Sequence, residues 1–143
     1  MTRIKLQVPD KVIYETVITV RITDINYGNH LGNDALVSIL HEARMQWLAS
    51  MNYSELNFAG TSLIMCDLAI EYKNEGFYKD ELVIKISIGE VSSVGFEIYY
   101  HIFNQHNKEI AKAKTGMVCF NYEIKKMTAV PDFFLQQINL KNN

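Results

Sequence analysis

The segment that decides how this chain folds is residues 24–44, which read DINYGNHLGNDALVSILHEAR. Glycine, asparagine and tyrosine dominate its first half, so we expect an irregular polar loop there. From Asp34 to about Met51, apolar residues recur every three or four positions, which is typical of a helix with a broad buried face. Asn33 or Asp34 can serve as the N-cap, because either side chain can accept hydrogen bonds from the first turn. The sequence therefore predicts a polar loop held against the start of a long, mostly buried helix.

Five other stretches are predicted to be β-strands, because β-branched and aromatic residues are dense in them or alternate with polar ones. The clearest alternation runs through Leu82, Ile84, Ile86 and Ile88, which predicts a strand with one buried face. The predicted strands cover residues 12–23, 62–72, 81–89, 95–104 and 110–121, and a short closing helix follows Pro131 over residues 132–138.

Two connections, residues 75–80 and 104–108, have the composition of hairpin turns, so we expect the strands beside each of them to pair antiparallel. One strand, a long helix and then four strands indicate an α+β arrangement in which a sheet wraps a single helix. No repeat, low-complexity segment or linker divides the chain, so residues 1–143 are expected to form one domain.

Composition argues against several classes of protein. The chain has 143 residues, of which 48% are hydrophobic and 21% charged, and no apolar run approaches the ~18 residues that a membrane span needs. The net charge is −2 with no basic cluster, so nucleic acid is a poor candidate partner. The first residues lack the apolar core of a signal peptide, which predicts a cytoplasmic location. Cys66 and Cys119 lie in apolar segments and are expected to be small core residues rather than a disulfide or nucleophiles.

Residues 24–44 also carry a resemblance to a known family. The family pattern is Asp-x-Asp/Asn-x-x-x-His-Val-Asn-Asn followed by a helix that ends in Glu-Ala-Arg, and this chain places Asp24, Asn26, His30 and Glu42 in the same register. On these residues the chain resembles the hot-dog-fold thioesterases of the 4-hydroxybenzoyl-CoA thioesterase type. The resemblance implies an antiparallel sheet of about five strands wrapped around one long central helix.

The resemblance also implies a function. It points to hydrolysis of an acyl thioester, of coenzyme A or of acyl carrier protein, by an activated water molecule. It further implies a homodimer or tetramer whose sheets join edge to edge, with the active site between protomers and the strand near residues 62–68 opposite the partner's motif loop. A non-hydrolytic acyl-thioester or lipid-binding module on the same fold is the alternative. A dehydratase or hydratase is less favoured, because the residues around His30 do not match the His-Phe-Pro-Gly pattern of the dehydratases.

Two departures from the family pattern bear on the chemistry. Asn26 stands where the 4-hydroxybenzoyl-CoA thioesterases have their essential carboxylate, and an amide cannot act as nucleophile or base at neutral pH. Gly32 replaces the usual asparagine, which removes a side-chain donor. His30 is therefore the first catalytic candidate, because its ordinary pKa lets it take a proton from water at neutral pH. Its alternative role is to tie the loop to the helix cap.

Glu42 is the second catalytic candidate. It lies on the narrow polar stripe of an apolar helix, where a carboxylate lining a crevice could activate water. An ion pair with a nearby cation is the equally weighted alternative. Arg44, on a different side of the helix, is expected to be solvated or at an interface.

Asp24 and Asn26 complete the catalytic candidates. Both are expected to hold turns, and Asn26 could also donate its amide to a thioester carbonyl or position a water molecule. The other loop residues are expected to bind the substrate. Gly28 permits backbone conformations that aim N–H groups inward, and Tyr27, Asn29 and Asn33 are expected to lie on the substrate-binding side of the loop.

Other polar residues are assigned weaker roles. Lys112 and Lys114 could meet the phosphates of coenzyme A, but a solvated strand face is favoured. His41, His101 and His106 have no spacing that would assemble a zinc site with the cysteines, so no metal or other cofactor is expected.

Overall fold

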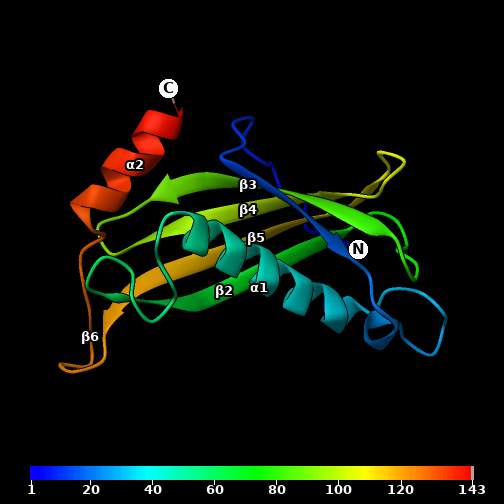
Figure 1. Cartoon of the computed structure of the whole chain (residues 1–143), viewed down its shortest axis with the longest axis horizontal. Coiled ribbons are helices and arrows are strands. Elements are labelled where there is room, and N and C mark those ends of the chain that lie inside the picture. The colour runs from blue at the N-terminus through cyan, green and yellow to red at the C-terminus, as the bar shows by residue number, and fades with distance from the viewer. Residues whose placement is uncertain (143) are drawn as a thin grey trace.

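The computed structural model describes residues 1–142 as a curved antiparallel sheet with one long helix lying across one of its faces (Figure 1). The helices are α1 (Asn33–Ser50) and α2 (Asp132–Asn142), with a short 3₁₀ helix, η1 (Ile22–Asp24), before the motif loop. The strands are β1 (Tyr14–Thr19), β2 (Ser62–Tyr72), β3 (Glu81–Val91), β4 (Gly95–Phe103), β5 (Glu109–Asn121) and β6 (Lys126–Met127).

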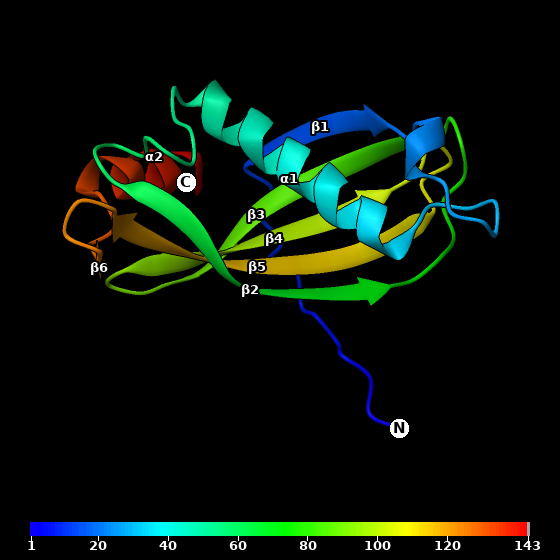
Figure 2. The same cartoon turned by 90° about the horizontal axis from the view of Figure 1, so that it is seen from below.

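The sheet has the order β1-β3-β4-β5-β2, and β6 pairs with β5 alone. Every pairing is antiparallel, with Val17 opposite Val83 and Ile84 opposite Ile102. Figure 2 shows how the sheet curves around α1. This confirms the predicted hot-dog fold and leaves β1 and β2 as the two edge strands.

The core lies between α1 and the concave face of the sheet. Leu82, Ile84 and Ile86 of β3 are fully buried, as the alternation predicts, and they share one core cluster with Leu40 and Trp47 of α1. Each such side chain contributes about 1.5–3 kcal/mol by its removal from water. Neither α-helix described in residues 1–142 has the apolar length that a transmembrane segment requires.

The C-terminal helix closes one end of this core. The Phe134 ring of α2 packs edge-on against Phe58, with ring centroids 4.7 Å apart, and against Trp47 at 6.0 Å. The predicted helix over residues 132–138 is confirmed and extends to Asn142.

Two predictions about the strands are wrong. The strand expected over residues 12–23 ends at Thr19, because the Asp24 carboxylate accepts the Arg21 backbone N–H at 2.8 Å and closes the η1 turn. Residues 75–80 do not form a hairpin, since β2 and β3 lie apart in the sheet and the connection crosses from one to the other. The hairpin at residues 104–108 is confirmed between β4 and β5.

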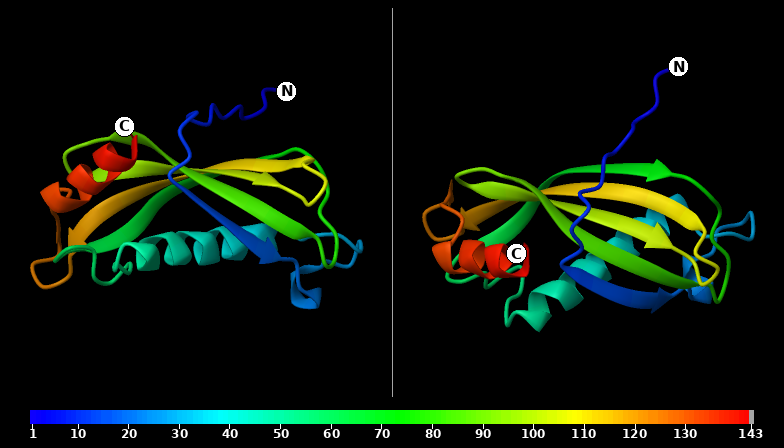
Figure 3. Two further views of the ribbon diagram at one scale, coloured as in Figure 1. Left: turned by 45° about the horizontal axis from the view of Figure 1, so that its top comes forward. Right: turned by 90° about the horizontal axis from the view of Figure 1, so that it is seen from above.

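An N-terminal arm covers part of the opposite face of the sheet. It precedes β1 and lies on the side away from α1 (Figure 3). The Leu6 N–H donates to Glu71 Oε1 at 2.9 Å, and the buried Ser87 hydroxyl donates to the Pro9 carbonyl at 3.4 Å. These contacts reach from β3 to β2, so the arm crosses the sheet.

The two cysteines differ from each other, and the prediction for one of them is wrong. Both are free thiols, and Cys119 is buried in the core as expected. Cys66 is exposed, because it occupies a bulge where the register between β2 and β5 shifts, so the strand alternation does not direct it inward.

Candidate active site

The motif loop between η1 and α1 is held by its own hydrogen bonds. Ile25 and Leu31 pair across its base, and the Asn26 backbone N–H donates to the His30 carbonyl at 2.9 Å. The Asn26 side-chain oxygen accepts from the Gly28 N–H at 2.8 Å and the His30 N–H at 3.4 Å. These bonds use the N–H groups of the loop internally, so they are not directed at a ligand as the sequence suggested.

The residue that needs an unusual backbone conformation is Asn29, whose φ is 68°. Asparagine tolerates this left-handed region better than most residues, because its short polar side chain bonds locally. Gly28 has no positive φ. A Cβ atom there would lie 3.2 Å from both Asn26 Oδ1 and His30 Nε2, so close packing between these side chains is the reason for glycine.

Asp24 has a structural role. Its carboxylate is buried and accepts from the backbone and the guanidinium of Arg21, while its own carbonyl accepts the Gly32 N–H at 2.9 Å. The carboxylate thereby fixes the turn that leads into the loop.

Helix α1 begins without a side-chain cap. Its N-cap is Gly32, not Asn33 or Asp34 as predicted, and no side chain accepts from its first turn. Among the hydrogen bonds of residues 1–142, none uses the backbone N–H groups of Asn33, Asp34 or Ala35. Unpaired donors and the helix dipole give this end of α1 a partial positive charge. A negatively charged or strongly polarised oxygen would be stabilised there.

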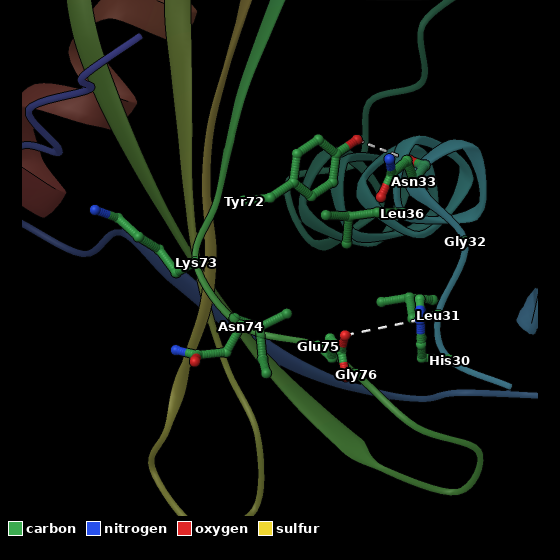
Figure 4. A pocket seen from close by; sticks show the side chains of 11 residues that line it. His30, Leu31, Gly32, Asn33, Leu36, Tyr72, Lys73, Asn74, Glu75 and Gly76 are labelled. Carbon is green, nitrogen blue, oxygen red and sulfur yellow. Dashed lines mark hydrogen bonds and ion pairs between the residues drawn. The ribbon is translucent and has the colours of Figure 1, made fainter. Parts of the chain in front are cut away.

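A cavity of about 290 Å³ lies beside this helix end. Two segments face each other across it, residues 30–36 from the loop and α1, and residues 72–76 from the end of β2 (Figure 4). The Leu31 N–H donates to the Gly76 carbonyl at 2.7 Å, and the Tyr72 hydroxyl donates to the Asn33 carbonyl at 2.9 Å. These two bonds tie the walls together, so the cavity is a built feature of the fold.

His30 is the catalytic candidate that lines this cavity. Its side chain is 35% exposed, and Nε2 lies 3.7 Å from the Glu75 carboxylate, beyond hydrogen-bond distance. The imidazole therefore reaches both the cavity and solvent, and it forms an ion pair with Glu75 when it is protonated.

The β2 side of the cavity was missed by sequence reasoning. Burial, with the nearby Asp34 charge as a second cause, raises the pKa of the Tyr72 hydroxyl, which therefore stays protonated and able to donate. The sequence places Tyr72 at the end of a predicted strand and Glu75 in the hairpin turn predicted at 75–80. A hairpin there would not bring either residue to the motif loop. The one available signal was that a tyrosine ends a strand beside three polar residues, Lys73, Asn74 and Glu75.

Several predicted site residues lie away from this cavity. Tyr27 and Asn29 are exposed at the tip of the loop and do not line it. Glu42 is exposed rather than on a costly buried stripe, and it lies about 13 Å further along α1 than Asn33. The structure therefore does not bring Glu42 and His30 together within one chain.

The prediction for Arg44 is wrong, because this residue is buried in the core. Its Nη1 donates to the Tyr100 hydroxyl at 3.1 Å and its Nε to Glu55 at 3.4 Å. Lys114 is also engaged, in ion pairs with Asp67 at 3.0 Å and Glu97 at 3.6 Å. Within residues 1–142, no three histidine, cysteine or acidic side chains lie together in a metal-binding arrangement.

Comparison with protein families agrees with this geometry. The model of the thioesterase-like superfamily matches residues 20–138, which include the motif loop, α1, strands β2 to β6 and the first part of α2, but not β1. The chain belongs to the thioesterase-like superfamily. The family therefore accounts for the segment around His30 and for the sheet that supports it.

Solved structures with the same fold are similar to this thioesterase-like chain at low sequence identity. A 1,4-dihydroxy-2-naphthoyl-CoA thioesterase from Synechocystis is 21% identical, with a TM-score of 0.79 over 87% of this chain and 94% of that one. A DHNA-CoA thioesterase from Staphylococcus aureus is 18% identical, with a TM-score of 0.77 over 90% and 94%. A Staphylococcus aureus protein solved in complex with CoA is 14% identical, with a TM-score of 0.80 over 96% and 87%. A search of curated proteins gave no match.

Proposed function

We propose that this thioesterase-like protein hydrolyses an acyl thioester of coenzyme A or of acyl carrier protein at the cavity beside His30. The observation that carries the proposal is the juxtaposition of the uncapped N-terminus of α1 with an imidazole in one cavity. During attack on a thioester, negative charge develops on the carbonyl oxygen. N–H donors placed at that oxygen lower the barrier, and one such donor is worth about 10²–10³ in rate.

The reaction proceeds by direct attack of water. The water oxygen bonds to the carbonyl carbon, the C–S bond breaks, and the leaving thiolate takes up the proton that the water gave up. No covalent intermediate forms at Asn26, because its side-chain oxygen is occupied by the loop amides and an amide is not nucleophilic. His30 contacts the thioester at the cavity and orients its carbonyl toward the helix N-terminus.

The structures with related folds support a thioester of coenzyme A as the substrate. The Synechocystis and Staphylococcus aureus thioesterases are named for a CoA thioester, and another neighbour was solved with CoA. The two free cysteines fit a protein that works in the reducing cytoplasm.

The exposed edge of the sheet supports a homodimer. Strand β2 has eleven residues and exposes every residue from Met65 to Leu68, and within residues 1–142 it pairs with β5 alone. A long edge with apolar side chains is a template for pairing with another strand. A second copy of β2 is the natural occupant, because antiparallel pairing of a strand with itself satisfies a twofold axis.

Such pairing would complete the site from two protomers. If β2 pairs with its copy about its midpoint, Tyr72 of one protomer lies opposite Ser62 of the other. The cavity beside His30 then borders the first half of the partner's β2. This is the placement expected from the sequence for the strand near residues 62–68, opposite the motif loop of the partner.

The function is tested by measuring free-thiol release from a panel of acyl-CoAs of different chain lengths and aryl groups. We expect turnover by the wild type, a loss of about 10²-fold in kcat/KM in His30→Ala, and no change in His106→Ala, a control at an exposed histidine in the β4–β5 turn. Tight binding of acyl-CoA without thiol release would contradict the proposal and favour the non-hydrolytic binding module.

A further inference from the structure

A second and larger groove lies between α1 and the first half of β2. Its volume is about 450 Å³, and apolar side chains, among them Met45, Leu63 and Met65, form most of its wall. Such a lining suits the acyl part of a thioester. The side chains of His41 and Glu55 interrupt the apolar wall.

These two side chains form an oriented pair. His41 Nε2 lies 2.7 Å from Glu55 Oε1. The same carboxylate oxygen accepts from Arg44 Nε at 3.4 Å, and Arg44 is anchored in the core through Tyr100. The Tyr100 hydroxyl in turn lies 2.7 Å from Thr115 Oγ1. A hydrogen-bonded chain thus runs from the buried sheet to an imidazole at the groove, and it fixes how that imidazole points.

This arrangement is that of a general base held by a carboxylate. With Nε2–H donating to Glu55, the neutral ring keeps its lone pair on Nδ1, where it can accept a proton from water. His30 has no comparable partner, since Glu75 lies 3.7 Å away. The charged or titratable groups at the groove besides His41 are Glu55, Arg44 and the Tyr122 phenol. Of these, Glu55 is the one that directly orients the imidazole.

We propose that His41 is the base that activates water in this thioesterase, and that it serves the site bordered by His30 of the partner subunit. This inference rests on the proposed function and on pairing of β2 with its copy. Within one chain His41 lies about 12 Å along α1 from Asn33, too far to serve the same carbonyl. Across the β2 joint, the groove of one protomer adjoins the Tyr72 end of the other. His41 Nδ1 takes a proton from water as the oxygen bonds to the carbonyl carbon, and the imidazolium returns it to the departing thiolate.

The first test measures kcat against pH for the wild type, His41→Ala, Glu55→Gln and the control His106→Ala. We expect kcat to fall by about 10²-fold or more in His41→Ala while KM changes by less than about threefold. The acidic limb of the wild-type profile should disappear in this variant, and added imidazole should restore part of the rate. Glu55→Gln should lose about tenfold because the imidazole is less firmly held. The control should match the wild type.

The second test asks whether the two histidines act in one composite site. His30→Ala and His41→Ala are each inactive or nearly so, and they are mixed under conditions that exchange subunits. In a mixed dimer, one of the two sites combines the intact His30 of the His41→Ala chain with the intact His41 of the His30→Ala chain. The other site lacks both histidines. Random exchange should therefore restore about a quarter of wild-type activity.

The outcomes separate this inference from the proposed function. Wild-type turnover with an unchanged kcat in His41→Ala would overturn the inference and leave the function intact. A loss of activity in His41→Ala that keeps the acidic limb and is not rescued by imidazole would also overturn it, because it would mark a structural role. Failure of the mixed dimers to regain activity would overturn action across subunits. Absence of wild-type turnover over the whole panel would overturn the function and the inference together.

Discussion

At the scale of single residues, Asn26 preserves the hydrogen bonds that hold the motif loop but cannot act as a catalytic carboxylate. The position occupied by a carboxylate in the resembling thioesterases here holds two loop amides, from Gly28 and His30, on one side-chain oxygen. An aspartate could accept the same bonds, so the architecture of the loop is independent of the charge. The reaction must then be driven by groups outside this position, which directs attention to the helix end and the histidines.

This reading predicts a difference between two variants of Asn26. Asn26→Ala removes the acceptor, so we expect the free energy of unfolding to fall by about 1 kcal/mol and kcat/KM to fall as His30 loses its fixed position. Asn26→Asp keeps the acceptor and should retain wild-type stability within about 0.5 kcal/mol. Urea unfolding followed by circular dichroism, together with the thiol-release assay, measures both effects. An alanine variant as stable and active as the wild type would refute the role of Asn26 in the loop.

A second prediction at this scale concerns Cys119. Burial raises the pKa of its thiol from 9.0 to about 11. Between these values the unfolded chain loses a proton that the folded chain keeps, so stability falls as pH rises from about 9 to 11, by up to about 2–3 kcal/mol. Below pH 9 both states hold the proton and the effect is absent. In urea unfolding, Cys119→Ala should lose less stability over this interval than the wild type, whereas Cys66→Ala, at an exposed thiol, should follow the wild type.

The residues of α1 show which features could be predicted from the sequence and which could not. Helical periodicity correctly predicted a long helix, but α1 is not mostly buried, because seven of its 18 residues are buried and the others are partly or fully exposed. His30 lies beside the start of this helix, as the motif predicted. The predicted exposure of Arg44 and the predicted burial of Glu42 are both wrong, because burial of a polar helix residue depends on partners elsewhere in the chain. Tyr100 and Glu55, which receive the Arg44 guanidinium, are separated from it by 56 and 11 residues. No local pattern announces such a partner.

At the scale of elements, a buried polar network helps to fix α1 to the sheet, in addition to the apolar core. Arg44 of α1 reaches Tyr100 of β4, whose hydroxyl also meets Thr115 of β5. All three side chains are buried, so the groups are shielded from water and each depends on the others for hydrogen bonds. The connection sets the position of α1 along the strands beneath it.

Removing the Tyr100 hydroxyl should therefore destabilise the folded protein. Tyr100→Phe leaves the Arg44 Nη1 donor and the Thr115 hydroxyl without this partner, and we expect a loss of about 1–3 kcal/mol in the free energy of unfolding. Tyr99→Phe is the matched control, because the neighbouring tyrosine lies on the other face of β4, outside this network. Urea unfolding of the two variants gives the comparison. Equal stabilities would show that the connection contributes nothing.

The strands were predictable in extent but not in all their pairings. Alternation and turn composition located β2, β3, β4 and β5 to within a few residues. The same turn composition suggested a hairpin at residues 75–80, where the chain instead crosses the sheet from β2 to β3. A turn-rich segment reverses the chain in both cases, and the choice of partner strand is decided by contacts across the whole sheet. That choice also determines that Tyr72 and Glu75 meet the motif loop.

At the scale of the whole molecule, the two edges of the sheet are in different situations. Strand β1 is short, and its Thr16 hydroxyl bonds to Gln46 of α1, so the helix approaches that edge. The N-terminal arm occupies part of the face opposite α1. The edge of β2 carries exposed apolar side chains at Met65, Leu68 and Tyr72 and has no partner strand in residues 1–142. Association of two chains through β2 would cover this surface and join the two cavities that flank it.

This difference predicts that a lysine disrupts association at the β2 edge but not at the β1 edge. In Leu68→Lys, the twofold pairing of β2 would bring two ammonium groups close to each other on either side of the centre of the joint, so we expect monomers and a loss of thiol release of at least about 10²-fold. Val17→Lys is the control, because it places the same charge at an exposed aliphatic side chain of β1. Val17 is 54% exposed and Leu68 is 37% exposed. We expect this variant to keep the mass of the wild-type assembly and its turnover. Sedimentation velocity and the thiol-release assay on the same samples test both variants. A Leu68→Lys protein that remains dimeric would show that the chains associate elsewhere, and a monomer with full activity would show that each chain holds a complete site.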